Sequence, residues 1–142
     1  MGSDALYVDI RLVNDKVKFK AASNLQPDKE ITFDYVPPVG DGEGFLGLEL
    51  LVTSFAGCVS TAFVFLLRRM GHAVLEYKMR ATAIRRESPV MLDKIVAQIS
   101  LGAAEIPAED IDKAIQTASN ISPVWLAIKS NVEVSVTYQA EL

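Results

Sequence analysis

The residue whose side chain is best suited to a chemical reaction is Cys58, the only cysteine among 142 residues, in the stretch FAGCVS over residues 55–60. A thiolate is a strong nucleophile that reacts with peroxides, whereas a buried neutral thiol behaves as a small apolar side chain. On a helix, the neighbours of Cys58 would be both apolar and hydroxyl residues: Leu51, Ser54, Phe55, Thr61, Ala62 and Phe65. The residue types therefore fit two interpretations, a reactive cysteine and a core residue.

Composition excludes several other kinds of chemistry. One cysteine and one histidine, His72, are too few for a zinc site of the usual cysteine and histidine type, and we expect neither a metal nor a bound cofactor. A single cysteine forms no intramolecular disulfide, so the fold needs no oxidising compartment. The net charge of −4 argues against a nucleic-acid partner, whose phosphates require clustered lysine and arginine.

The segment Phe45 to Leu67 is long and apolar enough to raise the question of a membrane span. It contains Glu49 and four hydroxyl residues, which are costly in lipid, so we expect a buried helix and no membrane span. The opening stretch MGSDALYVDIRL lacks the basic start and apolar core of a secretory signal. We therefore expect a cytoplasmic location.

Alternating strands and amphipathic helices surround this apolar segment. Asn14-Asp15 predicts a two-residue connection in a hairpin, and the Pro- and Gly-rich loop 37–44 leads into the helix, which should end near Gly71. The expected elements are strands over 6–13, 17–21 and 30–36, the helix, strands over 73–86 and 91–101, helices over 106–119 and 122–130, and a strand over 131–139. This order, β-β-β-α-β-β-α-α-β, predicts a single α+β domain over residues 1–142 with a largely antiparallel sheet.

Half of the residues are hydrophobic, and the mean hydropathy of +0.24 is high for a chain of this size. A small domain cannot bury all of its apolar residues, because much of its surface is exposed. We therefore expect part of its apolar surface to be hidden in an oligomer.

Four features together resemble the OsmC and Ohr family, the osmotically inducible protein C and organic hydroperoxide resistance proteins. They are the stretch LELLVTSFAGCVS over residues 48–60, the helix end at Gly71, the RRESP turn over 85–89 and the later ISPVW over 121–125. The resemblance covers nearly the whole chain. It implies an OsmC-like fold with a central helix that bears the cysteine, in an intertwined homodimer with the thiol at the subunit interface.

The resemblance also implies a thiol-dependent peroxidase. In active members the thiolate attacks the distal oxygen of an organic hydroperoxide and becomes a sulfenic acid, which a second cysteine in a Cys-Pro-Val motif resolves. The matching tripeptide here begins with Ser122. Since a hydroxyl does not condense with a sulfenic acid as a thiol does, Cys58 would need an external thiol reductant. A serine followed by proline is also a favoured helix start, and a cap residue can still line a pocket.

In the family an arginine from the N-terminal strands stabilises the thiolate and is held by a glutamate just ahead of the cysteine helix. Arg11 and Glu49 are the candidates here, although in the hydroperoxide-resistance branch the glutamate matches Leu48. In one straight helix, nine residues at about 100° each place Glu49 opposite Cys58, so only a helix that starts after Glu49 brings the two together. The alternatives are a carboxylate in the first helical turn for Glu49 and an exposed strand residue for Arg11.

Three functions stay open. The first is a one-cysteine peroxidase in which Cys58 is the nucleophile and an apolar pocket holds the alkyl tail of the hydroperoxide. The second is a non-catalytic dimer that binds a small apolar ligand in the same pocket. The third is a purely structural or interaction role.

Overall fold

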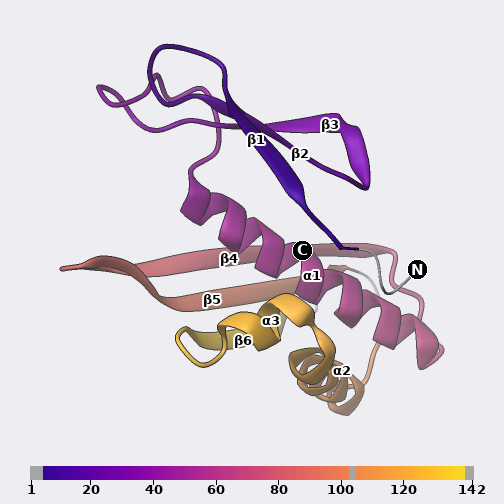
Figure 1. Cartoon of the computed structure of the whole chain (residues 1–142). Helices are drawn as coiled ribbons and strands as arrows, with labels where there is room; N and C mark the ends of the chain where they lie inside the picture. Colours follow the sequence, from indigo (N-terminus) through magenta and orange to yellow (C-terminus); the bar gives the residue numbers. More distant parts are fainter. Residues whose placement is uncertain (1–4, 103–104, 140–142) are drawn as a thin grey trace. The chain divides into compact units, whose positions relative to one another are not determined.

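The computed structural model describes residues 5–102 and 105–139, and its elements follow the predicted order β-β-β-α-β-β-α-α-β (Figure 1). The α+β fold class is therefore confirmed. The chain divides into two compact units, Met1–Leu50 and Leu51–Leu142. Each is described by itself, and a single domain over residues 1–142 stays a prediction. The first four residues of the stretch that was compared with a secretory signal lie outside the described residues.

The first unit contains a three-stranded antiparallel sheet of β1 (Val8–Leu12), β2 (Phe19–Ser23) and β3 (Gln26–Phe33). The predicted hairpin is present, but a two-residue connection at Asn14-Asp15 was wrong, because the loop covers residues 13–18. The side-chain oxygen of Asn14 accepts hydrogen bonds from the backbone N–H groups of Lys16 and Lys18, both at 3.0 Å, and these bonds stabilise the longer loop.

Strand β3 begins at Gln26, four residues before the predicted start at Glu30, so this boundary was wrong. The turn before it is short, because the Ser23 hydroxyl oxygen accepts hydrogen bonds from the N–H groups of Leu25 and Gln26, at 3.1 and 3.2 Å. The Pro and Gly residues after β3 do form the predicted loop before the helix.

Asp34 organises that loop. Its buried carboxylate accepts hydrogen bonds from the backbone N–H groups of Tyr35, Asp41 and Glu43, at 2.8, 3.2 and 3.1 Å. Burial opposes ionisation, but the three donors outweigh it, so the pKa of Asp34 lies below its ordinary value. Gly40 is required beside it, because a Cβ at this position would collide with the Asp34 carboxylate.

Asp34→Asn should loosen this loop at neutral pH, because an amide accepts fewer hydrogen bonds and turns a donor toward N–H groups. A lowered folded-state pKa gives stability above the ordinary aspartate pKa, about 4, which is lost as the pH falls through the folded-state value. Amide-exchange protection factors of Asp41 and Glu43 should therefore fall below about pH 4 in the wild type, and should start low and change less in the variant. Asp28→Asn, the same change at an exposed aspartate, is the control; an equal effect there would contradict the role of Asp34.

The second unit is a mixed three-stranded sheet with helices on one face (Figure 1). The strands are β4 (Glu76–Glu87), β5 (Val90–Gly102) and β6 (Glu133–Gln139), and the helices are α1 (Gly47–Arg69, which begins in the first unit), α2 (Ala108–Ile121) and α3 (Pro123–Ile128). The central β5 pairs antiparallel with β4 and parallel with β6. Strand β4 begins three residues later than predicted, because the carbonyl of Val74 accepts a hydrogen bond from the Arg68 guanidinium at 2.9 Å.

One stripe of α1 is buried. Phe63 and Leu67 pack with Ile99 of β5 and Ala114 of α2, and a second cluster surrounds Phe55. The expected burial of the helix holds for this stripe only, because other α1 residues, such as Leu51, Thr61 and Phe65, are exposed in the single chain.

The helix α1 ends at Arg69, near Gly71 as predicted, and the φ of Gly71, 96°, lies in the left-handed region. The N–H of His72 bonds to the carbonyl of Leu67 at 3.1 Å, and that of Gly71 to Arg68 at 3.0 Å. These two bonds form a Schellman motif, which satisfies carbonyls that the helix itself leaves unpaired.

Among residues 5–102 and 105–139, α1 is the one helix that is long and apolar enough to cross a membrane by length and composition. Core helices of soluble proteins meet the same criterion. One stripe of α1 packs on the sheet, while 22% of the apolar window is buried in the single chain.

Candidate thiol site at the α2–α3 junction

Cys58 lies on α1 at the border between the buried stripe and the exposed face. Its helix neighbours Phe55 and Val59 are buried, Thr61 and Phe65 are exposed, and Cys58 itself is half-buried. A cysteine that only filled the core would be expected among the fully buried residues of the stripe. The position of Cys58 leaves its sulfur at the edge of the core.

Ser122 is the single residue between α2 and α3, and it is almost fully buried. Its N–H donates to the carbonyl of Ala118 and its carbonyl accepts from the N–H of Leu126, both at 2.9 Å, so the two helices satisfy its backbone. The predicted N-cap position with proline next to it is present, but the hydroxyl caps nothing. Instead, the Ser122 hydroxyl donates a hydrogen bond to the Cys58 sulfur at 3.0 Å.

A cavity of about 380 Å³ opens beside this contact. Its lining is mostly apolar and comprises Cys58, Thr61, Ala62 and Phe65 of α1 with Ile121, Ser122 and Pro123 of the junction. The Thr61 hydroxyl donates a hydrogen bond to the carbonyl of Gly57 at 2.8 Å. The volume suits a small organic molecule, with the cysteine and serine as the polar point in an apolar wall.

The sequence predicted only part of this lining. Thr61, Ala62 and Phe65 follow from helical spacing around Cys58, whereas Ile121 and Pro123 were not identified. Both are chain neighbours of Ser122, so they could have been identified once Ser122 was known to contact Cys58.

Arg11 lies on β1 in the first unit, where its guanidinium forms an ion pair with Glu30 of β3. The hydrogen bond and charge of Glu30 raise the pKa of Arg11, and the hydrogen bond from Arg11 lowers the pKa of Glu30. The Arg11 side chain is 62% exposed, which agrees with the alternative of an exposed strand residue. A role for Arg11 toward the thiolate stays a prediction.

Glu49 lies in the first turn of α1, and its carboxylate accepts a hydrogen bond from the N–H of Leu46 at 2.8 Å. This bond back to the residue before the helix is half of a capping box. Because α1 begins at Gly47, the spacing along the helix places Glu49 and Cys58 on opposite sides of it. The predicted condition for a contact within one chain, a helix that starts after Glu49, is not met, and Glu49 as a partner of Cys58 stays a prediction.

In the described part of the chain, one cluster of potential metal ligands is present, formed by Asp34, Asp41 and Glu43. Asp41 pairs with Lys16 at 2.6 Å, Glu43 pairs with Lys18, and Asp34 binds three backbone N–H groups. These contacts already neutralise or satisfy the carboxylates, so a cation would have to displace them.

The family model described as OsmC-like protein matches residues 40–137. The fold is similar to an OsmC-like protein from Mycoplasma pneumoniae, at 16% identity over 98% of this chain and 99% of that chain, with a TM-score of 0.81. It is also similar to an OsmC-like protein of unknown function from Vibrio cholerae, at 12% identity over 96% and 99%, with a TM-score of 0.81.

An organic hydroperoxide resistance protein OsmC from Legionella pneumophila is a third structural relative, at 11% identity over 96% of this chain and 98% of that chain, with a TM-score of 0.75. At such identities the three structures show a shared fold. A comparison with curated protein sequences gives no match.

Proposed function

The chain belongs to the OsmC-like protein family, and we propose on that premise that it is a thiol-dependent peroxidase for organic hydroperoxides, with Cys58 as its nucleophile. The observation that carries this proposal is the hydrogen bond of Ser122 to the Cys58 sulfur at the edge of an apolar cavity. The name of the Legionella relative, an organic hydroperoxide resistance protein, supports the substrate class.

The cavity and the hydrogen-bonded pair of Cys58 and Ser122 suit the oxidative half of the reaction. The apolar wall would hold the alkyl group of the hydroperoxide, and the Cys58 thiolate would attack its distal oxygen. The O–O bond breaks, the alkoxide takes a proton from water and leaves as an alcohol, and Cys58 becomes a sulfenic acid. The Ser122 hydroxyl, which donates to the sulfur, would stabilise the thiolate before the attack.

The reductive half would require an external thiol. Ser122 stands where the family has its resolving cysteine, and an oxygen cannot form the disulfide. A reductant thiol would condense with the sulfenic acid and release water, and a second thiol would cleave the mixed disulfide to restore Cys58. A dithiol would supply both steps in one molecule, and no bound cofactor or metal would take part.

The second copy of a homodimer would complete this site. Leu51, Thr61 and Phe65 leave an exposed, mostly apolar face on α1, which a partner chain would cover. Arg11 and Glu49 remain the proposed partners of the thiolate, and they would act from that second copy. We place this reaction in the cytoplasm, where reducing thiols are abundant.

The activity can be tested by consumption of cumene hydroperoxide with dithiothreitol and then with dihydrolipoamide. The wild type should consume hydroperoxide in a cycle that depends on the thiol, and Cys58→Ser should fall to the uncatalysed rate, because an alcohol does not react with peroxide. Ser119→Ala, at a serine of α2 whose hydroxyl donates to the carbonyl of Gln116, is the matched control and should retain activity. Equal rates for the wild type and Cys58→Ser would overturn the proposal.

The second candidate is a non-catalytic dimer that holds a small apolar ligand in the same cavity. The absent resolving thiol and the apolar lining favour it. Native mass spectrometry of the purified protein would detect a retained small molecule. A ligand that stays bound to a protein without peroxidase activity would select this candidate, and an empty, ligand-indifferent dimer would exclude it.

A further inference from the structure

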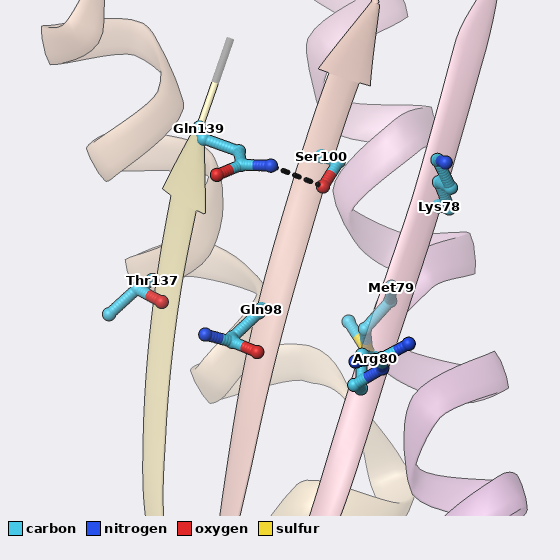
Figure 2. Close-up of a pocket in the computed structure, with 7 residues that line it drawn as sticks. All are labelled: Lys78, Met79, Arg80, Gln98, Ser100, Thr137 and Gln139. Carbon is cyan, nitrogen blue, oxygen red and sulfur yellow. Dashed lines mark hydrogen bonds between the residues drawn. The ribbon is translucent and has the colours of Figure 1, made fainter. Parts of the chain in front are cut away.

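The sheet of the second unit has a face that the helices leave uncovered. Along β4, Tyr77, Met79 and Ala81 turn toward the helices and pack against the core, so the alternate residues Lys78 and Arg80 lie on the opposite face. Figure 2 shows this face with the helices behind the strands.

Six polar side chains form two rows across this face. The strand register aligns Lys78 with Ser100 and Gln139, and the next row joins Arg80, Gln98 and Thr137. With Met79, these residues line a cavity of about 350 Å³ (Figure 2). The Gln139 amide donates to the Ser100 hydroxyl oxygen at 3.2 Å, which leaves the Ser100 O–H able to donate elsewhere.

The charges of this cavity are unbalanced. Lys78 and Arg80 are both exposed, and neither side chain has an ion pair or hydrogen bond to another residue in the part of the chain that the structure describes. No carboxylate is among the lining residues. Among the described residues, the nearest acidic positions on the same face are Glu76, two residues before Lys78 on β4, and Glu133, which pairs with Lys94 at 3.0 Å.

We propose that this face binds the phosphate group of a small hydroxylated phosphate ester, held by Lys78 and Arg80. A guanidinium offers two parallel N–H donors to a phosphate and an ammonium adds a compact charge, so the two are complementary to one oxyanion. Gln98, Ser100 and Thr137 supply the amide and hydroxyl groups that bind the hydroxyls of the ester. The site lies on the face of the sheet away from the helices, so it does not depend on the chemistry of Cys58.

The binding can be tested by nuclear magnetic resonance titration with glucose 6-phosphate, inorganic phosphate and glucose, at fixed ionic strength. Glucose 6-phosphate should give saturable shifts at the backbone amides of Lys78, Arg80 and Gln98, and glucose alone should give none. The double variant Lys78→Gln, Arg80→Gln should bind at least roughly tenfold more weakly, since it loses two charge-assisted contacts.

The matched control is Lys94→Gln, because Lys94 is a cation on the same face that already pairs with Glu133. It should change the affinity by no more than about twofold, as expected for a charge outside the site. Arg80→Lys retains the charge but loses the planar fork, and should weaken binding several-fold. Shifts that do not saturate, or equal affinities of the wild type and the double variant, would overturn the proposal. A face occupied by a second copy of the chain would also give no binding and would overturn it.

Discussion

Ser122→Cys should convert the site into one that closes a disulfide with Cys58 on oxidation. The Ser122 oxygen already lies 3.0 Å from the Cys58 sulfur, and a sulfur at this position would have to approach by only about 1 Å to reach the S–S bond length. After attack on a hydroperoxide, the introduced thiol would condense with the Cys58 sulfenic acid and release water. In the wild type the sulfenic acid should persist and, with excess peroxide, proceed to sulfinic acid.

Mass spectrometry after one equivalent of cumene hydroperoxide distinguishes the two outcomes. The wild type should be trapped by dimedone as the sulfenic acid adduct, while Ser122→Cys should lose two hydrogen atoms and give no adduct. Its turnover with a dithiol should then be faster, because the resolving step becomes intramolecular.

The control for this experiment is Ser119→Cys, which adds a thiol one turn earlier on α2. Ser119 bonds to the carbonyl of Gln116 and has no hydrogen bond to Cys58. Its variant should react like the wild type. A disulfide of equal yield in both variants would mean that any added thiol can reach Cys58, and the specific placement of Ser122 would then be contradicted.

The order of the elements could be predicted because each has a strong local signal. The helix end at Gly71 is an example, since cationic residues followed by glycine identify a C-terminal cap without knowledge of the rest of the chain. The boundaries that failed depend on side-chain hydrogen bonds. Asn14 lengthens one loop and Ser23 shortens the next turn, and neither bond has a periodic pattern in the sequence.

The thiol site could be predicted in its residues but not in its contacts. Cys58 and Ser122 were both identified, the second only through the resemblance to a family motif. Local rules assigned the Ser122 hydroxyl to a helix cap, and tertiary packing gave it to Cys58 instead. The pair Lys78 and Arg80 had no motif at all, because its significance comes from the register of three strands that meet only in the folded sheet.

Phe55→Ala should destabilise the second unit by about 3–5 kcal/mol, the usual effect of removing a fully buried aromatic side chain. The Phe55 ring contacts Trp125 edge-on, with 5.6 Å between ring centroids. This pair joins α1 to α3. Phe55 lies one helical turn before Cys58, and Trp125 lies one turn after Ser122. The variant should therefore lose the Cys58–Ser122 contact as well as stability. Chemical denaturation would measure the loss in free energy of unfolding.

Phe63→Ala separates these two effects. Phe63 is equally buried on the same helix, but it packs with Leu67 and Ile99 in the other core cluster. Both substitutions should reduce the free energy of unfolding by a similar amount, since each removes the same side chain from a core. In a Ser122→Cys background, however, only Phe55→Ala should lower the yield of the disulfide under conditions where both proteins are folded. Equal yields would show that the Phe55–Trp125 contact contributes to stability without positioning the thiol site.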